Sequence, residues 1–121
     1  RRIARDPEVA ELLARVRWLR FLRMAYDTNA LRDDVHRAVE LLGRCGIPPR
    51  KLFFYVLVRD DIDEALRRIR ELKALGCVPF AQPYRDFTGG TKPSREAWRL
   101  AYWCNKKRLF NAMDFADYTC K

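Results

Sequence analysis

Apolar positions repeat along the chain with two different periods, which predicts a succession of helices and strands. In some stretches the apolar residues recur every three or four positions, the spacing of one helix face. Shorter apolar runs are bounded by turn residues, as strands are. Gly46 and Gly76 stand where two of the helices should stop. Helices are predicted at about 6–16, 33–45, 61–75 and 94–109, and strands at 19–26, 52–58 and 77–82.

The order of these elements is that of successive parallel βα units, so the chain is predicted to be an α/β protein with three parallel strands. The central run, 52–58, is apolar throughout, which predicts that helices cover both faces of the sheet. Three such strands form an open sheet or part of a barrel, and a piece of a barrel would expose an edge that favours aggregation or dimerisation. The 121 residues fit one domain, 1–121, in which 94–121 forms a closing helix and tail.

The chain is strongly basic, with 25 Lys and Arg against 16 Asp and Glu and a formal net charge of +9. Such a charge is compatible with a polyanionic partner such as nucleic acid. The cations are dispersed, however. Those that alternate with acids along what is expected to be an outer helix face are Arg67, Arg68, Arg70 and Lys73. Solvated helix faces are therefore the preferred interpretation, and nucleic-acid binding is the alternative.

No apolar run approaches the roughly 20 residues of a membrane-spanning helix, and no signal peptide opens the chain. We therefore expect no membrane partner and a cytoplasmic location, where thiols stay reduced. No two cysteines form a Cys-x-x-Cys pair and no His cluster accompanies them, so no metal site is predicted. Cys45 and Cys77 fall on apolar faces and are expected to be small buried side chains. The cysteines are Cys45, Cys77, Cys104 and Cys120.

The single histidine, His36, lies on the second predicted helix between Val35 and Arg37. Histidine is suited to acid–base chemistry at neutral pH. Since no neighbour is apparent that would orient the ring as a base, His36 is predicted to face solvent.

Polar residues follow all three predicted strands, where ligands bind in parallel α/β folds. Each has a structural alternative. Asp27 and Asn29 would also serve a turn or cap, and Asp60 a helix cap. Gln82 needs a polar partner, which a backbone group would equally supply, and Tyr84 is expected to pack. The candidate ligand-binding residues are Asp27, Asn29, Arg59, Asp60, Gln82 and Tyr84; no catalytic residue is assigned.

The last predicted helix mixes aromatic residues with positive charge. Trp98, Tyr102 and Trp103 precede the basic run 106–108. Single-stranded nucleic acid is bound by such mixtures, through stacking on the rings and contacts of cations with phosphates. The preferred interpretation is that Trp98 and Tyr102 pack inward, because they stand at helical spacing, while the lysines face water.

Several segments resemble radical S-adenosylmethionine (SAM) enzymes. They include 6–31, 35–46 and 53–58, the stretch 72–86 (LKALGCVPFAQPYRD), and the segment 100–110 (LAYWCNKKRLF), which is similar to the closing helix of one bacterial and phage-associated subgroup. The resemblance extends over almost the whole chain. It implies a partial (β/α) barrel and a 4Fe–4S cluster that chelates SAM. It also implies reductive cleavage of SAM to a 5′-deoxyadenosyl radical that abstracts hydrogen from a substrate, which the resemblance does not identify.

The cluster in that family is held by a Cys-x-x-x-Cys-x-x-Cys loop after the first barrel strand, and this chain has no such loop. The resemblance therefore implies a C-terminal portion whose partner is the N-terminal half of the barrel. Arg1 in place of Met favours excision from a longer chain. Neither SAM nor the cluster is expected to bind stably to this chain alone.

The nucleoside side of the SAM pocket is what the resemblance assigns to these residues. The strand that ends at Asp27 resembles the one that supplies ribose contacts, which implicates Asp27 and Asn29. Strand 52–58 resembles the one that borders adenine, although Arg59 stands where relatives usually carry Gly and would crowd the base. Strand 77–82 also borders the nucleoside, which makes Gln82 and Tyr84 further candidates.

Overall fold

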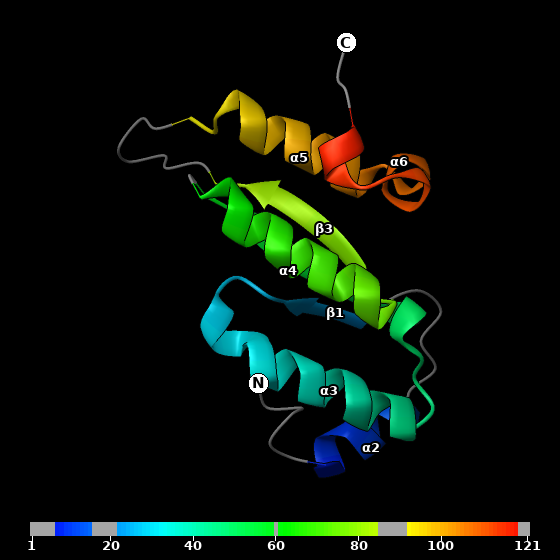
Figure 1. Cartoon of the computed structure of the whole chain (residues 1–121). Helices are drawn as coiled ribbons and strands as arrows, with labels where there is room; N and C mark the ends of the chain where they lie inside the picture. Colours follow the sequence, from blue (N-terminus) through cyan, green and yellow to red (C-terminus); the bar gives the residue numbers. More distant parts are fainter. Residues whose placement is uncertain (1–6, 16–21, 60, 85–91, 119–121) are drawn as a thin grey trace.

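The computed structural model describes residues 7–15, 22–59, 61–84 and 92–118 (Figure 1). Helices and strands alternate through most of the chain, and short 3-10 turns join some of them. The helices are α2 (Pro7–Arg15), α3 (Arg32–Arg44), α4 (Ile62–Leu75), α5 (Arg95–Asn105) and α6 (Lys107–Ala112), the strands are β1 (Leu22–Ala25), β2 (Leu52–Val58) and β3 (Val78–Pro83), and the 3-10 turns are η1 (Asn29–Leu31), η2 (Pro49–Lys51) and η3 (Phe115–Asp117).

The three strands form one sheet in the order β1-β2-β3, and both pairings are parallel. Leu22 pairs with Leu52, and Phe53 pairs with Val78, so β2 lies in the centre. The predicted α/β fold with three parallel strands is therefore confirmed. None of the described helices is long and apolar enough to span a membrane.

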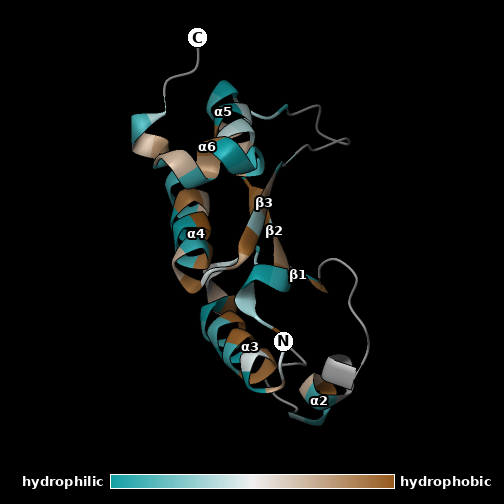
Figure 2. Cartoon of the chain, turned by 90° about the vertical axis from the view of Figure 1, so that its right-hand side faces the viewer, coloured by the Kyte–Doolittle hydropathy of each residue, from teal (hydrophilic) through white to brown (hydrophobic). Residues whose placement is uncertain are grey.

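Helices cover one face of this sheet. Alternate residues of β2, from Leu52 to Val58, are buried, as are Leu22 of β1 and Ala81 of β3. Figure 2 shows α3 and α4 on one side of the strands, and α4 packs on both β2 and β3. The apolar stripes of these amphipathic helices supply the rest of the core. The buried stripe of α3 is Val35, Ala38, Val39 and Leu42, and that of α4 includes Ala65, Leu66, Ile69 and Leu72.

The opposite side of the sheet, called here the open face, is only partly covered within the described residues. Phe53, Tyr55 and Leu57 of β2 are half-buried there, although helices were predicted to cover both faces. That prediction is wrong because the outward side chains of β2 pack on each other and on β3: the ring of Phe53 stacks on Phe80 at 5.6 Å and meets Tyr55 edge-on at 5.2 Å. The open face comprises Arg23, Ala25, Phe53, Tyr55, Leu57, Val78, Phe80 and Gln82.

Side chains cap the N-termini of α4 and α5, and a glycine ends α4. The Asp61 side chain accepts a hydrogen bond from the Glu64 N–H at 3.2 Å, and Ser94 accepts one from Ala97 at 3.1 Å. Gly76 ends α4 with φ of 82°, a left-handed conformation that glycine adopts without steric cost.

The helix predicted at 94–109 is two helices instead. Helix α5 ends at Asn105, the backbone of Lys106 is extended, and α6 begins at Lys107 in a new direction. This turn places the Phe110 ring 5.1 Å from that of fully buried Trp103, and Phe115 of the tail lies 5.6 Å from the same indole. Burial of these rings favours the break over one straight helix.

The outer edge of β3 is closed by its own sequence. Pro79, Ala81 and Pro83 direct their backbone groups away from β2, and the two prolines have no N–H to offer. The Asn105 amide of α5 accepts a hydrogen bond from the Ala81 N–H at 2.8 Å and donates one to the Ala81 carbonyl at 3.0 Å. The side chain thus takes the place of a neighbouring strand.

The outer edge of β1, in contrast, keeps outward backbone groups that a further strand could bind. Arg23 and Ala25 direct their backbone N–H and C=O groups away from β2, since Tyr26 donates its N–H to Tyr55. Within the described ranges these outward groups have no hydrogen-bond partner. The prediction of an exposed edge strand therefore applies to β1 and is wrong for β3.

Replacing Asn105 with alanine leaves both backbone groups of buried Ala81 without a partner. We expect Asn105→Ala to lower the free energy of unfolding by about 2 kcal/mol, measured by urea denaturation. Asn111→Ala is the control, because Asn111 is an exposed residue of α6 and its loss should change stability by less than about 0.5 kcal/mol. Equal stability of the two variants would contradict the role of Asn105.

Candidate functional site at the carboxyl edge of the sheet

The polar segments that follow the three strands meet at one edge of the sheet, called here the carboxyl edge. Parallel pairing brings the strand ends to the same side. Gln82 of β3 is in register with Leu57 of β2, and Asp27 contacts the opposite flank of Leu57. Two of the predicted residues, Asp27 and Gln82, therefore stand on either side of one backbone position.

Asp27 completes the hydrogen bonding of β2 beyond the end of β1. Its Oδ1 accepts a hydrogen bond from the Leu57 N–H at 3.3 Å. The Leu57 carbonyl accepts one at the same distance from Nη2 of Arg68, whose side chain is buried on α4. The prediction that Arg68 lies on an outer helix face is therefore wrong. Asp27 thus has a structural role, but it bonds the backbone of a neighbouring strand and does not form the turn or cap that was its alternative. This bond holds its carboxylate at the edge.

Arg59 and Tyr84 meet at the β3 side of the edge. The Tyr84 N–H donates to the Val58 carbonyl at 2.7 Å, which extends the pairing of β2 and β3 by one residue. The Arg59 guanidinium then lies over the Tyr84 ring, 5.4 Å from its centroid. Tyr84 is 44% exposed, so the expectation that it packs is wrong: it is covered from one side by a cation. Gln82 is exposed as well.

Two predicted residues add nothing to this geometry. Asn29 is the first residue of η1, so its backbone follows the exit of β1, while its side chain lies outside the described part of the chain. Asp60 also lies outside the described residues.

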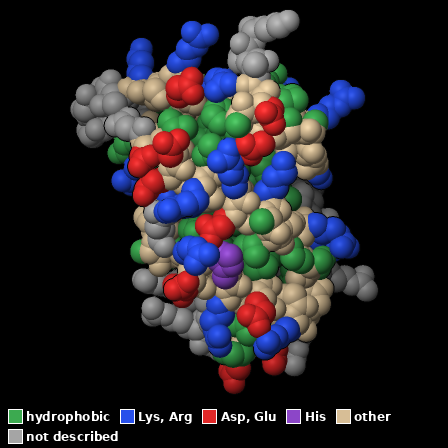
Figure 3. All heavy atoms as spheres, viewed as in Figure 1, with side chains coloured by type: hydrophobic (Ala, Val, Ile, Leu, Met, Phe, Trp, Pro, Cys, Tyr) green, Lys and Arg blue, Asp and Glu red, His purple; other side chains and the backbone are tan. Residues whose placement is uncertain are grey.

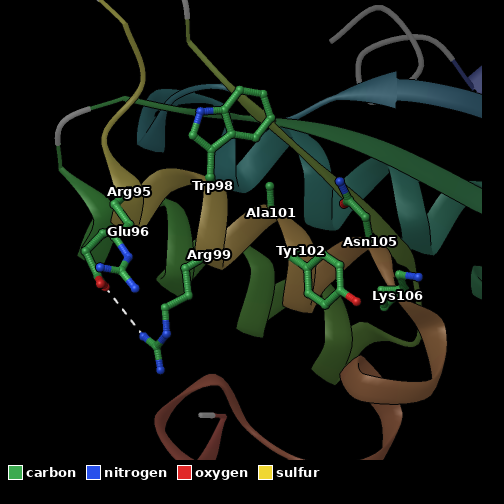
Figure 4. Close-up of a pocket in the computed structure, with 8 residues that line it drawn as sticks. All are labelled: Arg95, Glu96, Trp98, Arg99, Ala101, Tyr102, Asn105 and Lys106. Carbon is green, nitrogen blue, oxygen red and sulfur yellow. Dashed lines mark hydrogen bonds and ion pairs between the residues drawn. The ribbon is translucent and has the colours of Figure 1, made fainter. Parts of the chain in front are cut away.

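A hollow on α5 adjoins the carboxyl edge. It measures about 700 Å³ and is lined on one helix face by residues that include Trp98, Tyr102 and Asn105 (Figure 4). A second hollow, of about 470 Å³, lies between β3 and α5 and shares Trp98, Ala101 and Asn105 with the first. Its β3 wall contains Gln82 and Tyr84, so the predicted edge residues and α5 border one continuous depression.

The prediction that Trp98 and Tyr102 pack inward is wrong. They are 53% and 52% exposed, whereas Trp103 is fully buried. Besides Trp103, the buried residues of α5 are small or aliphatic, and the helix packs on β3 and α4. These small or aliphatic residues, Ala97, Leu100, Ala101 and Cys104, recur at helical spacing and could have identified the inner face from the sequence.

Three side chains gather around the Glu71 carboxylate near the end of β1, between α3 and α4, and form what is called here the Glu71 cluster. Oε1 of Glu71 is 2.7 Å from His36 Nε2 and accepts a hydrogen bond from Arg32 Nε at 2.6 Å, while Oε2 accepts one from the Tyr26 hydroxyl at 2.8 Å. Figure 3 shows the histidine, in purple, among acidic and basic side chains. His36 thus has an orienting carboxylate that the sequence did not reveal, while its side chain is still 36% exposed, as a solvent-facing helix residue would be.

The pKa values of this cluster reflect burial and hydrogen bonding. Burial, followed by the hydrogen bond to Glu71, raises the pKa of Tyr26 to about 12. Burial acts to raise the pKa of Glu71 as well, but hydrogen bonds with His36, Tyr26 and Arg32 outweigh it and hold the pKa below its usual value. The cluster therefore favours an ionised Glu71 that is shared by three partners, which ties α3, α4 and the end of β1 together.

The cysteines offer no iron–sulfur site within the described residues. No group of three or more His, Cys, Asp or Glu side chains lies together there as metal ligands would. Cys77 and Cys104 are buried, as was predicted for Cys77, and burial raises the pKa of each thiol to about 12. Cys45 is partly buried against the core. Because iron–sulfur clusters bind thiolates, Cys77 and Cys104 do not fit a cluster.

Comparison of the chain with protein-family models, curated proteins and solved structures finds no match in any of the three.

Replacing Glu71 with glutamine tests the cluster through its pH dependence. Because the pKa of Glu71 is lower in the folded chain than in the unfolded chain, ionisation stabilises the fold above the unfolded pKa, and this contribution disappears as the pH falls through the folded pKa. We expect Glu71→Gln to cost about 2 kcal/mol of unfolding free energy at neutral pH, and the difference from the parent chain to shrink in acid.

The control is Glu40→Gln, which removes an exposed carboxylate paired with Arg44 on the same helix. Its effect should stay within about 0.5 kcal/mol at both pH values. Urea denaturation at neutral and acidic pH measures both variants, and a pH-independent cost of Glu71→Gln would contradict the assignment.

Proposed function

We propose that the chain is the later part of the partial (β/α) barrel of a radical SAM enzyme, and that its carboxyl edge supplies the nucleoside side of the SAM pocket. One observation carries the proposal: three sequentially adjacent parallel strands have helices on one face and an aromatic face left open on the other. In (β/α) barrels the helices lie outside and the inward side chains of the strands line the interior.

The open face has the composition of such an inner wall. Its apolar centre, with Phe53, Tyr55 and Phe80, is rigidified by ring contacts of 5.2–6.0 Å. Arg23 extends over it from β1, with its guanidinium 5.6 Å from the Phe53 ring centroid. At the carboxyl edge the face ends in exposed Gln82, where a ligand of the barrel would bind.

The two edges of the sheet also support a barrel segment. Further strands add where backbone groups are unpaired, and among the described residues the sheet offers such groups at Arg23 and Ala25 of β1. The edge of β3 is closed by prolines and Asn105, as the last strand of an incomplete barrel requires. In sequential βα order, strands beside β1 come from residues that precede it, which is where the family carries its cluster loop.

The residues of this chain would bind and orient the nucleoside. The amide of Gln82 is exposed at the open face and can both donate and accept hydrogen bonds to a base or ribose. Asp27, held in place by Leu57, presents a carboxylate suited to a ribose hydroxyl. Arg59, which stands where relatives carry Gly, lies over Tyr84 toward β3. The cluster, whose ligands lie outside this chain, would supply the electron that cleaves SAM in a reducing cytoplasm.

The coding sequence upstream of Arg1 gives the first test. We expect a Cys-x-x-x-Cys-x-x-Cys loop there, and we expect the whole protein, purified without oxygen, to contain iron and sulfide and to release 5′-deoxyadenosine from SAM after reduction. Absence of the loop, or a protein with neither cluster nor 5′-deoxyadenosine, would overturn the proposal.

A matched pair of variants tests the site within that protein. Gln82→Ala removes an amide at the carboxyl edge, whereas Asn111→Ala removes one from exposed α6. We expect Gln82→Ala to weaken SAM binding about tenfold in equilibrium dialysis, with unchanged iron content, because an orienting hydrogen bond is lost. The Asn111 variant should bind like the parent. Equal affinity of both variants would remove Gln82 from the site.

A further inference from the structure

The exposed large aromatic side chains of the described residues lie around one depression. Tyr84, Trp98 and Tyr102 are 44%, 53% and 52% exposed, and each lines one or both of the adjoining hollows on α5 and β3. Trp98 belongs to both hollows. Grouped exposed rings of this kind mark an interaction surface, since leaving them in water forgoes their burial. We call Tyr84, Trp98 and Tyr102 the aromatic strip.

Cations surround the aromatic strip. Lys106 lies 5.2 Å from the centroid of the Tyr102 ring, and Arg59 lies over Tyr84. Arg95 and Arg99 line the same hollow. The acid in its lining, Glu96, is 3.5 Å from Arg99 and is neutralised by it. The surface is therefore positive in balance, within a chain whose net charge is +9.

Trp98 is the ring best placed to stack on a ligand. No other ring or cation of the described residues lies on its indole. Figure 4 shows Trp98 and Tyr102 on two sides of Ala101, whose small side chain leaves the hollow between them. The two rings are four residues apart on α5, which separates them by about 6 Å along the helix axis. The Tyr102 ring is already stacked on Tyr118, with centroids 6.3 Å apart, so Trp98 is the ring that a base would stack on.

We propose that the aromatic strip binds single-stranded nucleic acid, with a base stacked on Trp98 and phosphates held by Arg95 and Lys106. Stacking on exposed rings combined with cation–phosphate contacts is the general mode of binding single strands without sequence preference. A duplex buries the faces of its bases and cannot offer them to Trp98. An acidic peptide would satisfy the cations but leave the indole without a stacking partner. The proposed contacts, Trp98, Arg95 and Lys106, belong to α5 and its C-cap, whereas Tyr84 of the strip also borders the carboxyl edge. The proposal rests on the α5 contacts and does not require SAM to bind at that edge.

Fluorescence anisotropy of a labelled oligo(U) RNA of about 12 nucleotides tests the proposal on the 121-residue chain. We expect binding that weakens as salt rises and that is not competed by double-stranded RNA of equal length. Quenching of tryptophan fluorescence should accompany binding and disappear in Trp98→Leu. Absence of binding at micromolar chain, or equal competition by duplex, would overturn the proposal. So would preferential competition by poly-glutamate, which would indicate an acidic protein partner.

Paired variants separate stacking from charge. Trp98→Leu should weaken RNA binding about tenfold, while Trp98→Phe, which keeps a ring, should retain most of the affinity. Arg95→Gln should reduce the salt dependence by about one ion, whereas Arg67→Gln, an equal loss of charge on α4, should not. Circular dichroism checks that each variant folds. Equal affinities for Trp98→Leu and Trp98→Phe, or equal effects at Arg95 and Arg67, would refute the proposed contacts.

Discussion

The pairing of β2 with parallel neighbours on both sides, while helices cover only one face of the sheet, constrains the rest of the structure. Leu52, Phe54, Val56 and Val58 alternate toward the helices and form the centre of the core. The residues between them must then face the other way, and the described helices leave them only half-buried. Parallel pairing also directs every strand exit to one edge, so the open face and the polar exits come from the same arrangement.

The unequal edges of the sheet connect stability with the proposed function. At β3, prolines and the Asn105 amide remove the hydrogen-bonding groups that another strand would need. At β1, Arg23 and Ala25 keep theirs. Within the described part of the chain, the sheet can therefore accept a further strand beside β1 and not beside β3, which is what the proposed segment of an incomplete barrel would need. α5 serves twice in this arrangement, because its buried side closes β3 while its exposed side carries the aromatic strip.

Local sequence patterns predicted the helices, the strands, the glycine that ends α4 and the parallel sheet. The spacing of apolar residues and the positions of glycines and prolines decide these features within a few residues of the chain. They did not predict contacts between distant segments. Glu71 of α4 contacts His36 of α3, and Asp27, which follows β1, accepts a hydrogen bond from Leu57 of β2. The apolar sequence of β2 is compatible with a strand that helices cover on both faces and with a strand whose second face carries aromatic residues on the open face. The sequence alone therefore could not show which of the two arrangements the chain adopts. Trp98 was assigned inward from its spacing alone, although the stripe of Ala97, Leu100, Ala101 and Cys104 occupies that side of α5.

Amide hydrogen exchange, followed residue by residue, tests most directly whether this sheet is closed at β3 and open at β1. The account predicts slow exchange for the Ala81 amide, which Asn105 binds, and fast exchange for the Ala25 amide in the 121-residue chain. It further predicts that Ala25 becomes protected when preceding residues are present. Protection of Ala25 in the 121-residue chain, or rapid exchange of Ala81, would contradict it.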